Sequence, residues 1–269
     1  MDDPLWREST IKKLTQILQL DNQVLSLSLF GSLVNTEVEK DKWSDIDALL
    51  VVEDAAFSKY SDSSDWLNSL GEIFVIMRST GEQNQTTKVI FSDFRKIDLI
   101  LLTKSRMLRK KPFWTKQVFV FTNSTEVKQF LEDNALKTEL DNLNVYDLDK
   151  LANDFWFLAF TAVSKVVRND LLIALHLALD LYRNCLLLGM WLRDKETGTY
   201  IHRIGGVRND LVEKMDIKIT DLSKEGILNL IENCGKEFDK LAKEWSPNYE
   251  AYAPLFKTAI DQAKKDLQS

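Results

Sequence analysis

Two neighbouring stretches decide the fold: Leu29-Phe30-Gly31-Ser32 and, after a short loop, Trp43-Ser44-Asp45-Ile46-Asp47. Residues 24–30 alternate apolar and small polar side chains, a pattern typical of a half-buried strand, and this strand ends in Gly-Ser. Residues 46–52 form a second strand-like run, which opens with Asp-Ile-Asp and then becomes continuously apolar. The second strand is therefore expected to be buried on both faces toward its end.

The two acids of the second stretch indicate chemistry with a metal ion. Alternate residues of a strand point to the same face, so Asp45 and Asp47 project together while Ile46 enters the core. Two carboxylates about 4 Å apart repel by about 4 kcal/mol at an effective dielectric constant of 20, and a divalent cation between them relieves this repulsion. Mg²⁺ takes one or two carboxylates and completes its shell with phosphate oxygens and water. Gly31 leaves room for a phosphate, and Ser32 offers N–H and hydroxyl donors.

A third acid, Asp98, lies inside the apolar run Ile97–Leu102. A lone acid in the core of a sheet is unfavourable unless it is paired, protonated or bound to a metal. If this strand lies beside residues 46–52, Asp98 joins the other two acids, and three carboxylates on adjacent strands predict a two-metal site for phosphoryl or nucleotidyl transfer. Gly-Ser after a strand is usually a plain turn, and Asp-x-Asp is common. The prediction of a metal site therefore rests on the ordered combination of Gly-Ser, Asp-x-Asp and the later Asp98.

The remaining patterns predict an α+β fold with two domains. The first, residues 1–140, is expected to hold a mixed, twisted sheet, with a hairpin whose turn is Asp93–Lys96. Its expected strands are 24–30, 46–52, 72–77, 88–91, 97–102 and 118–121, with helices at 5–20 and 65–70. The second, residues 145–269, is expected to be helical, with helices at 147–168, 170–193, 222–245 and 249–267. We expect the active site in the cleft between the domains.

Composition limits the classes of partner. The chain has 269 residues, of which 45% are hydrophobic and 28% charged, with a formal net charge of −6. These values exclude a mostly disordered chain. The acidic balance disfavours nucleic acid, which needs clustered Lys and Arg, and suits a cationic or small neutral molecule.

The cysteines and the apolar segments predict a cytoplasmic protein without a membrane span. Cys185 and Cys234 form no CxxC pair, so we expect two buried free thiols in a reducing compartment. The acidic N-terminal segment does not resemble a signal peptide. The apolar stretch 171–192 contains His176 and Asp180, which favour a buried helix over a transmembrane one, with His176 in the core.

The chain resembles the nucleotidyltransferase superfamily of DNA-polymerase-beta type. It shares the order of motifs in that superfamily: Gly-Ser, a short loop, Asp-x-Asp and a later Asp. From about residue 10 to residue 210 it is more closely similar to the aminoglycoside 6-adenylyltransferases, or streptomycin adenylyltransferases. The segments that carry this similarity are Gly31-Ser32 with Asn35, Asp45–Asp47, Asp65-Trp66-Leu67, Lys96-Ile97-Asp98-Leu99, Phe155-Trp156, Lys165, Arg168 and Leu171–Leu187. Members of the family often have Arg at the position of Leu33, so this chain lacks a cation there.

The resemblance implies Mg²⁺-dependent transfer of AMP from ATP to a hydroxyl of an aminoglycoside such as streptomycin, with release of pyrophosphate. Asp45 and Asp47 would hold Mg²⁺ against the triphosphate. Gly31 and Ser32 would receive the phosphates. Asp98 would ligate a second metal ion or accept the proton of the acceptor hydroxyl.

The helical domain is expected to bind both substrates. Lys165 and Arg168 are three residues apart and share a helix face, and the resemblance implies that they contact the triphosphate. Trp156, with Phe155, is a candidate to stack on a base or flank the acceptor, and Asp154 to bind an acceptor ammonium group. Each also has a plain structural interpretation: a solvated basic turn, a core aromatic pair and a surface acid.

Other functions remain open on the sequence alone. They are a nucleotidyltransferase with a different acceptor (a protein side chain or a nucleic-acid end), a toxin–antitoxin component, and a degenerate nucleotide-binding domain. Leu33 favours the last of these. Intact Asp45, Asp47 and Asp98 oppose it, because a binding-only domain has no need of three acids that repel one another.

Overall fold

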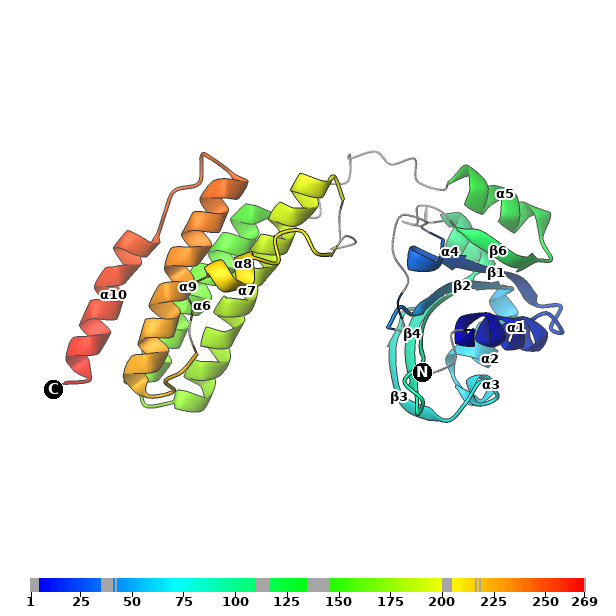
Figure 1. Cartoon of the computed structure of the whole chain (residues 1–269), viewed down its shortest axis with the longest axis horizontal. Helices are drawn as coiled ribbons and strands as arrows, with labels where there is room; N and C mark the ends of the chain where they lie inside the picture. The colour runs from blue at the N-terminus through cyan, green and yellow to red at the C-terminus, as the bar shows by residue number, and fades with distance from the viewer. Residues whose placement is uncertain are drawn as a thin grey trace. The chain divides into compact units, whose positions relative to one another are not determined.

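The computed structural model describes residues 5–34, 41, 43–109, 117–134, 146–199, 205–215, 217 and 219–268. The chain divides into two compact units, Met1–Glu139 and Leu140–Ser269. The first contains a sheet with helices on both faces, and the second contains helices (Figure 1). The expected α+β class is confirmed.

The sheet of the first unit is six-stranded and mixed, with strand order β3-β4-β5-β2-β1-β6. The strands are β1 Val24–Phe30, β2 Ile46–Val52, β3 Ile73–Thr80, β4 Asn84–Phe91, β5 Lys96–Thr103 and β6 Val118–Thr122. The two central strands β2 and β5 are parallel, and the other neighbouring pairs are antiparallel. The hairpin predicted at Asp93–Lys96 is present between β4 and β5.

Strand β4 begins at Asn84 rather than at the predicted Lys88. Its first residues are polar, and two of them, Gln85 and Thr87, are buried. The amide of Gln85 donates to the carbonyl oxygen of Ser61 at 3.0 Å, and the hydroxyl of Thr87 donates to the side chain of Gln85 at 2.8 Å. These bonds satisfy the buried polar groups, which an apolar pattern cannot reveal.

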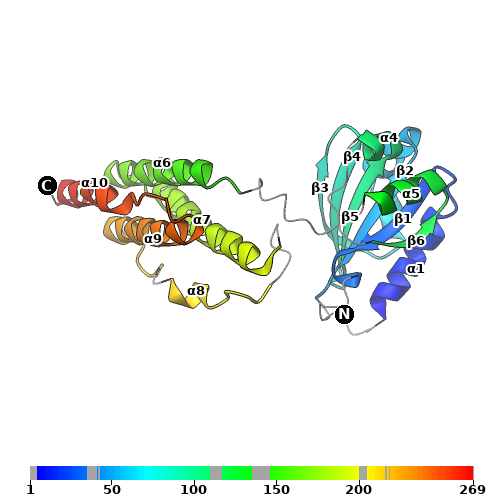
Figure 2. The same ribbon diagram turned by 90° about the horizontal axis from the view of Figure 1, so that it is seen from above.

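Helices cover both faces of the sheet (Figures 1 and 2). They are α1 Trp6–Leu18, α2 Phe57–Ser61, α3 Asp65–Asn68, α4 Lys104–Arg109 and α5 Thr125–Asp133, with 3₁₀ turns at Gly31–Leu33 and Asp54–Ala56. Helices α1–α3 share one hydrophobic cluster with Ile46 and Ala48 of β2. Helices α4 and α5 share another with Leu49 and Val51. Because side chains alternate along β2, Asp47 lies on the same face as α4 and α5.

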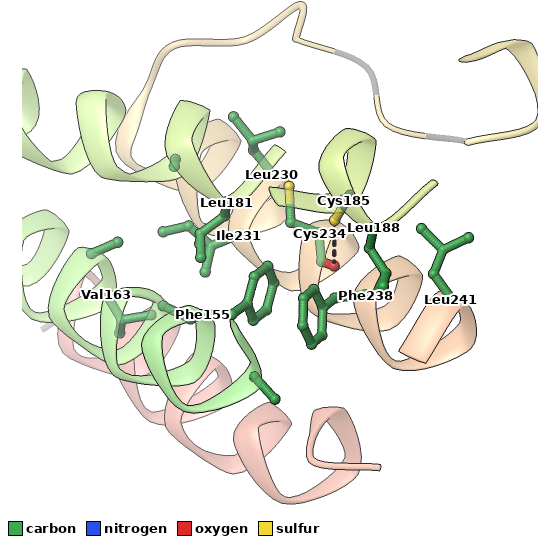
Figure 3. Close-up of a cluster of buried hydrophobic side chains, with 14 of the residues drawn as sticks. Phe155, Val163, Leu181, Cys185, Leu188, Leu230, Ile231, Cys234, Phe238 and Leu241 are labelled. Atoms are coloured by element: carbon green, nitrogen blue, oxygen red, sulfur yellow. Dashed lines mark hydrogen bonds between the residues drawn. The ribbon is translucent and has the colours of Figure 1, made fainter. Parts of the chain in front are cut away.

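The second unit is a bundle of long helices around one apolar core (Figure 2). Its helices are α6 Leu148–Val167, α7 Leu171–Thr197, α8 Leu211–Lys214, α9 Lys224–Trp245 and α10 Ala253–Asp266. In the core, the rings of Phe155 and Phe238 stack with centroids 3.9 Å apart, and the thiol of Cys185 donates to the carbonyl oxygen of Cys234 (Figure 3). Both cysteines are buried and free, as predicted.

Helix α7 is less buried than the sequence predicts. Among the described residues it is the one helix long and apolar enough to cross a membrane by length and composition, and 28% of its most apolar window is buried. The prediction of a core position for His176 was wrong, because its side chain is 73% exposed and lies 3.8 Å from the carboxylate of Asp180. Leucines occupy both sides of this helix, with Leu172 and Leu179 exposed, so periodicity did not distinguish its inner from its outer face.

Candidate active site

Asp45, Asp47 and Asp98 lie together at one end of the two parallel central strands. Asp47 of β2 is the register partner of Asp98 of β5, and Asp45 immediately precedes β2. Paired residues on neighbouring strands point to the same face. One carboxylate oxygen from each of the three acids lies within 4.8 Å of the others. The structure thus brings together the three acids that the sequence singled out.

Gly31 brings the end of β1 against Asp47. Phe30 is the register partner of Asp47, and Gly31 follows it with φ of 67°, as the first residue of a 3₁₀ turn. A β-carbon at Gly31 would lie 2.1 Å from Oδ2 of Asp47, so glycine is the residue that fits. Ser32 lies half-buried in the same turn.

The environment of Asp47 disfavours its charge. Burial, with the neighbouring carboxylates of Asp45 and Asp98, raises the pKa of Asp47 to about 7. The ammonium groups of Lys96 and Lys88 act in the opposite direction and do not cancel this effect. A positive charge added near the three acids would favour the ionised form of Asp47.

Two lysines, Lys88 and Lys96, face the acids, and no sequence pattern predicted a role for either of them. Lys88 of β4 is the register partner of Asp98, and its Nζ lies 2.9 Å from Oδ2 of that residue. Lys96, the first residue of β5, places Nζ 2.5 Å from Oδ2 of Asp45 and 3.3 Å from Oδ1 of Asp98. The spacing Lys96-Ile97-Asp98 does place both charged side chains on one face of a strand. Finding Lys88 required the register of β4 against β5.

The donor atoms of this site fit a hard divalent cation. Oδ1 of Asp98 is buried and accepts no hydrogen bond within the described residues, although the ammonium group of Lys96 lies near it. Two oxygens that bind one Mg²⁺ at about 2.1 Å lie no more than about 4.2 Å apart, close to the spread of the three carboxylates. Asp45, Asp47 and Asp98 are therefore the residues that would hold Mg²⁺.

The loop before Asp45 is anchored by Arg7 of α1. Nε and Nη2 of Arg7 donate to the carbonyl oxygen of Ser44 at 3.0 and 2.7 Å, and Nη2 also donates to the carbonyl oxygen of Asp41. Oδ1 of Asp41 accepts from the backbone N–H groups of Trp43 and Ser44. No pattern in the sequence predicts this positioning role of Arg7. Asn35, part of the family resemblance, lies outside the described residues.

The predicted nucleotide-binding residues of the second unit lie at the end of α6. Nζ of Lys165 forms an ion pair with Oδ2 of Asp170 at 3.1 Å. Arg168 caps the C-terminal end of the helix and is exposed. Lys165 thus lies in the last turn of α6, and Arg168 is the residue that follows the helix.

The two predicted acceptor-binding residues differ in burial. Asp154 is exposed, with Lys150 at 3.6 Å on the same helix. Trp156 is half-buried, and its Nε1 donates to the hydroxyl of Tyr249 at 3.0 Å. The Trp156 ring also packs against Tyr252 and Phe256. These contacts hold Trp156 in an aromatic cluster between α6 and the α9–α10 region.

Comparison with known proteins gives a family match. The sequence profile of the streptomycin adenylyltransferase family matches residues 7–193. A crystal structure of an aminoglycoside 6-adenyltransferase from Bacillus subtilis shares 14% identity over 97% of this chain and 99% of that chain, with a TM-score of 0.42. A spectinomycin adenyltransferase from Enterococcus faecialis, with ATP and spectinomycin, shares 15% identity over 97% and 99% of the two chains, with a TM-score of 0.29. The search of curated proteins found no match.

Proposed function

The chain belongs to the streptomycin adenylyltransferase family, and we propose that it transfers AMP from ATP to a hydroxyl group of an aminoglycoside such as streptomycin, releasing pyrophosphate. Family membership makes the chain an adenylyltransferase enzyme that acts on aminoglycosides. ATP as donor, streptomycin as acceptor and the dependence on Mg²⁺ are the proposed parts. The buried, reduced thiols of Cys185 and Cys234 suit the cytoplasm, where we place the reaction.

The observation that carries the proposal is the convergence of three carboxylates beside a glycine turn. Asp45, Asp47 and Asp98 would hold the metal ion, and Gly31 keeps the backbone of the turn clear of side-chain atoms. Ser32 would donate to phosphate oxygens from the same turn. When bound, Mg²⁺ would neutralise phosphate charge and favour attack at the α-phosphorus.

The order of strands suggests the role of Asp98. The glycine turn ends β1, the first two acids are on or beside β2, and Asp98 is on β5, which lies on the far side of β2 from β1. Phosphates held by Ser32 would therefore be farthest from Asp98, and the acceptor would approach from the side of Asp98. The acceptor oxygen would form a bond to the α-phosphorus while the bond to the bridging oxygen of pyrophosphate breaks. Pyrophosphate would leave with that electron pair, and Asp98 would take the hydroxyl proton.

The second unit would supply further contacts to both substrates. Lys165 and Arg168 carry positive charge in the same helical turn, which suits a triphosphate. The exposed carboxylate of Asp154 suits an ammonium group of the acceptor. We also propose that Trp156 lines the acceptor site with the exposed part of its ring.

Mass spectrometry of reaction mixtures tests this function. The protein is incubated with Mg²⁺, one nucleoside triphosphate at a time, and a panel of aminoglycosides that includes streptomycin and spectinomycin, with a protein mixture and an oligonucleotide as acceptors in parallel reactions. We expect streptomycin to gain the mass of one AMP with ATP, and no gain with the Asp47→Asn variant. A mass gain on a protein or on an oligonucleotide end would instead support one of the other acceptors. No gain on any acceptor would support a degenerate nucleotide-binding domain.

A further inference from the structure

Lys96 lies beside the three acids, whose mutual repulsion requires a positive charge when no metal ion is bound. Its ammonium group bridges the carboxylate of Asp45, just before β2, and that of Asp98 on β5, at 2.5 Å from Oδ2 of Asp45 and 3.3 Å from Oδ1 of Asp98. Both acids belong to the group of three that could hold a metal ion. A metal ion bound by these acids would compete with Lys96 for the same two carboxylates.

The geometry of the sheet holds this contact in place. Lys96 and Asp98 are two residues apart on β5 and so point to the same face. The side chain of Lys96 is 35% exposed, against 62% for Lys59, which pairs with Asp21 away from the site. An ion pair that is partly shielded from water is screened less by salt than an exposed one. Lys88, by contrast, pairs with Asp98, whereas Asp45 pairs with Lys96.

We propose that the ammonium group of Lys96 is a resident counter-ion of the metal-free enzyme, and that a divalent cation must displace it from Asp45 and Asp98 in order to bind. This inference rests on the proposed function, because it takes the three acids as the metal site. The flexible four-carbon stem of lysine allows the ammonium group to leave the carboxylates while it stays near them.

Displacement of Lys96 couples metal binding to nucleotide binding. Once released, the ammonium group loses two carboxylate partners, and the oxygens of a triphosphate are the anions that the proposed reaction brings to the site. Without nucleotide, the metal ion therefore has to compete with Lys96 for the carboxylates of Asp45 and Asp98. Metal with nucleotide binds more favourably, because the phosphates give the released lysine a new partner. By linkage, the nucleotide and the metal strengthen each other's binding by the same factor.

Binding of Mn²⁺, measured by electron paramagnetic resonance of the free ion, tests this proposal without any acceptor or turnover. The wild type is compared with Lys96→Met, which keeps most of the stem and removes the charge. Lys96→Arg keeps the cation, and Lys59→Met is the matched control, since it removes a paired lysine of the same unit elsewhere. Each protein is titrated alone and with a non-hydrolysable ATP analogue.

We expect Lys96→Met to bind Mn²⁺ alone about tenfold more tightly than the wild type, as loss of a partly shielded competing charge predicts. The strengthening of Mn²⁺ binding by the ATP analogue should shrink in this variant. Lys96→Arg and Lys59→Met should bind Mn²⁺ within about twofold of the wild type. Asp45→Asn should lose the site, which locates the bound ion.

Wild-type or weaker Mn²⁺ affinity in folded Lys96→Met would overturn the proposal, as would the absence of Mn²⁺ binding in both proteins. If Lys96→Met does not fold, Lys96→Gln replaces it with the same expected outcome. If neither neutral variant folds, tighter binding of Mn²⁺ alone to Lys96→Arg than to the wild type overturns the proposal, and binding within about twofold supports it. Failure of AMP transfer to aminoglycosides would leave these metal-binding results unchanged, so the two failures can be told apart.

Discussion

A β-carbon on Gly31 would lie 2.1 Å from Oδ2 of Asp47, well inside van der Waals contact. This close approach lies between the end of β1 and the start of the acid-bearing strand β2, because Phe30 and Asp47 are register partners. Gly31 also has a left-handed backbone, with φ of 67°. Both its conformation and its neighbour therefore require glycine, and its neighbour is one of the acids proposed to hold the metal.

Gly31→Ala should reduce turnover about a hundredfold, because the new methyl group must push the carboxylate of Asp47 out of place. Gly198→Ala is the matched control, since Gly198 has φ of 66° and nothing within 4 Å of a built β-carbon. Both variants should lose about 1 kcal/mol of folding free energy from the left-handed backbone. The additional loss of stability and activity should be confined to Gly31→Ala, as measured by thermal unfolding and steady-state kinetics. Equal kinetics in the two variants would contradict the role of this contact.

The raised pKa of Asp47 predicts how the stability of the metal-free protein depends on pH. The pKa of Asp47 is about 7 in the folded chain, against an ordinary value of 3.8. Between these values the folded chain binds a proton that the unfolded chain does not, so the free energy of unfolding falls as pH rises. Asp47→Asn removes this ionisation. In EDTA, we expect the variant to melt a few degrees above the wild type at about pH 8, and this difference to shrink at about pH 5.

Added Mg²⁺ provides a check on this dependence of Tm on pH. Added Mg²⁺ should stabilise the wild type at the higher pH and leave Asp47→Asn nearly unchanged. A Tm difference between the two proteins that is the same at both pH values would show that Asp47 does not titrate in this range.

Asp45→Asn and Asp47→Asn should each reduce turnover by orders of magnitude, because each removes a proposed metal ligand and leaves the side-chain volume almost unchanged. Asp62→Asn, a substitution of the same type on the C-cap of α2, serves as the control for loss of one negative charge. Chelation of divalent cations should abolish turnover of the wild type, and Mg²⁺ should restore it. Near-wild-type turnover in folded Asp47→Asn would rule out the site assignment.

The sequence sufficed to locate the three acids because strand alternation fixes the face of each residue. Asp45 and Asp47 follow directly from that rule, and Asp98 needed one further assumption, that its strand lies beside β2. That assumption held, since β2 and β5 are parallel neighbours.

The contacts that support the acids could not be predicted in the same way. Lys88 lies beside Asp98 because of the register of β4 against β5. The polar residues in the first half of β4 made the start of this strand hard to predict. Arg7 reaches Ser44 across 37 residues of sequence, and no local pattern records a contact of that kind. The exposure of His176 was mispredicted because α7 carries leucines on both sides.

Lys165→Ala should lower kcat/KM for ATP about tenfold, through loss of one charge-assisted contact to phosphate. The affinity for the acceptor should change less. Lys214→Ala is the control in the same unit, since Lys214 also pairs with an acid, Asp210, to which no role is assigned. Steady-state kinetics with ATP varied at a fixed acceptor concentration measure the effect. If KM and kcat for ATP are both unchanged, Lys165 serves only its ion pair with Asp170.

Salt should weaken the binding of streptomycin. Aminoglycosides are polycations, and a chain with a net charge of −6 raises their local concentration near its acids. The Debye length falls from about 10 Å at 0.1 M salt to about 3 Å at 1 M, so affinity should fall severalfold across that range. Asp154→Asn should weaken binding further at low salt, whereas Asp149→Asn, which removes an exposed acid from the same helix, should not. Calorimetry with streptomycin, alone and with a non-hydrolysable ATP analogue, measures both effects. If no heat is released in either titration while Mn²⁺ still binds to the three acids, the acceptor belongs to another class of molecule, because the donor side of the site would be intact.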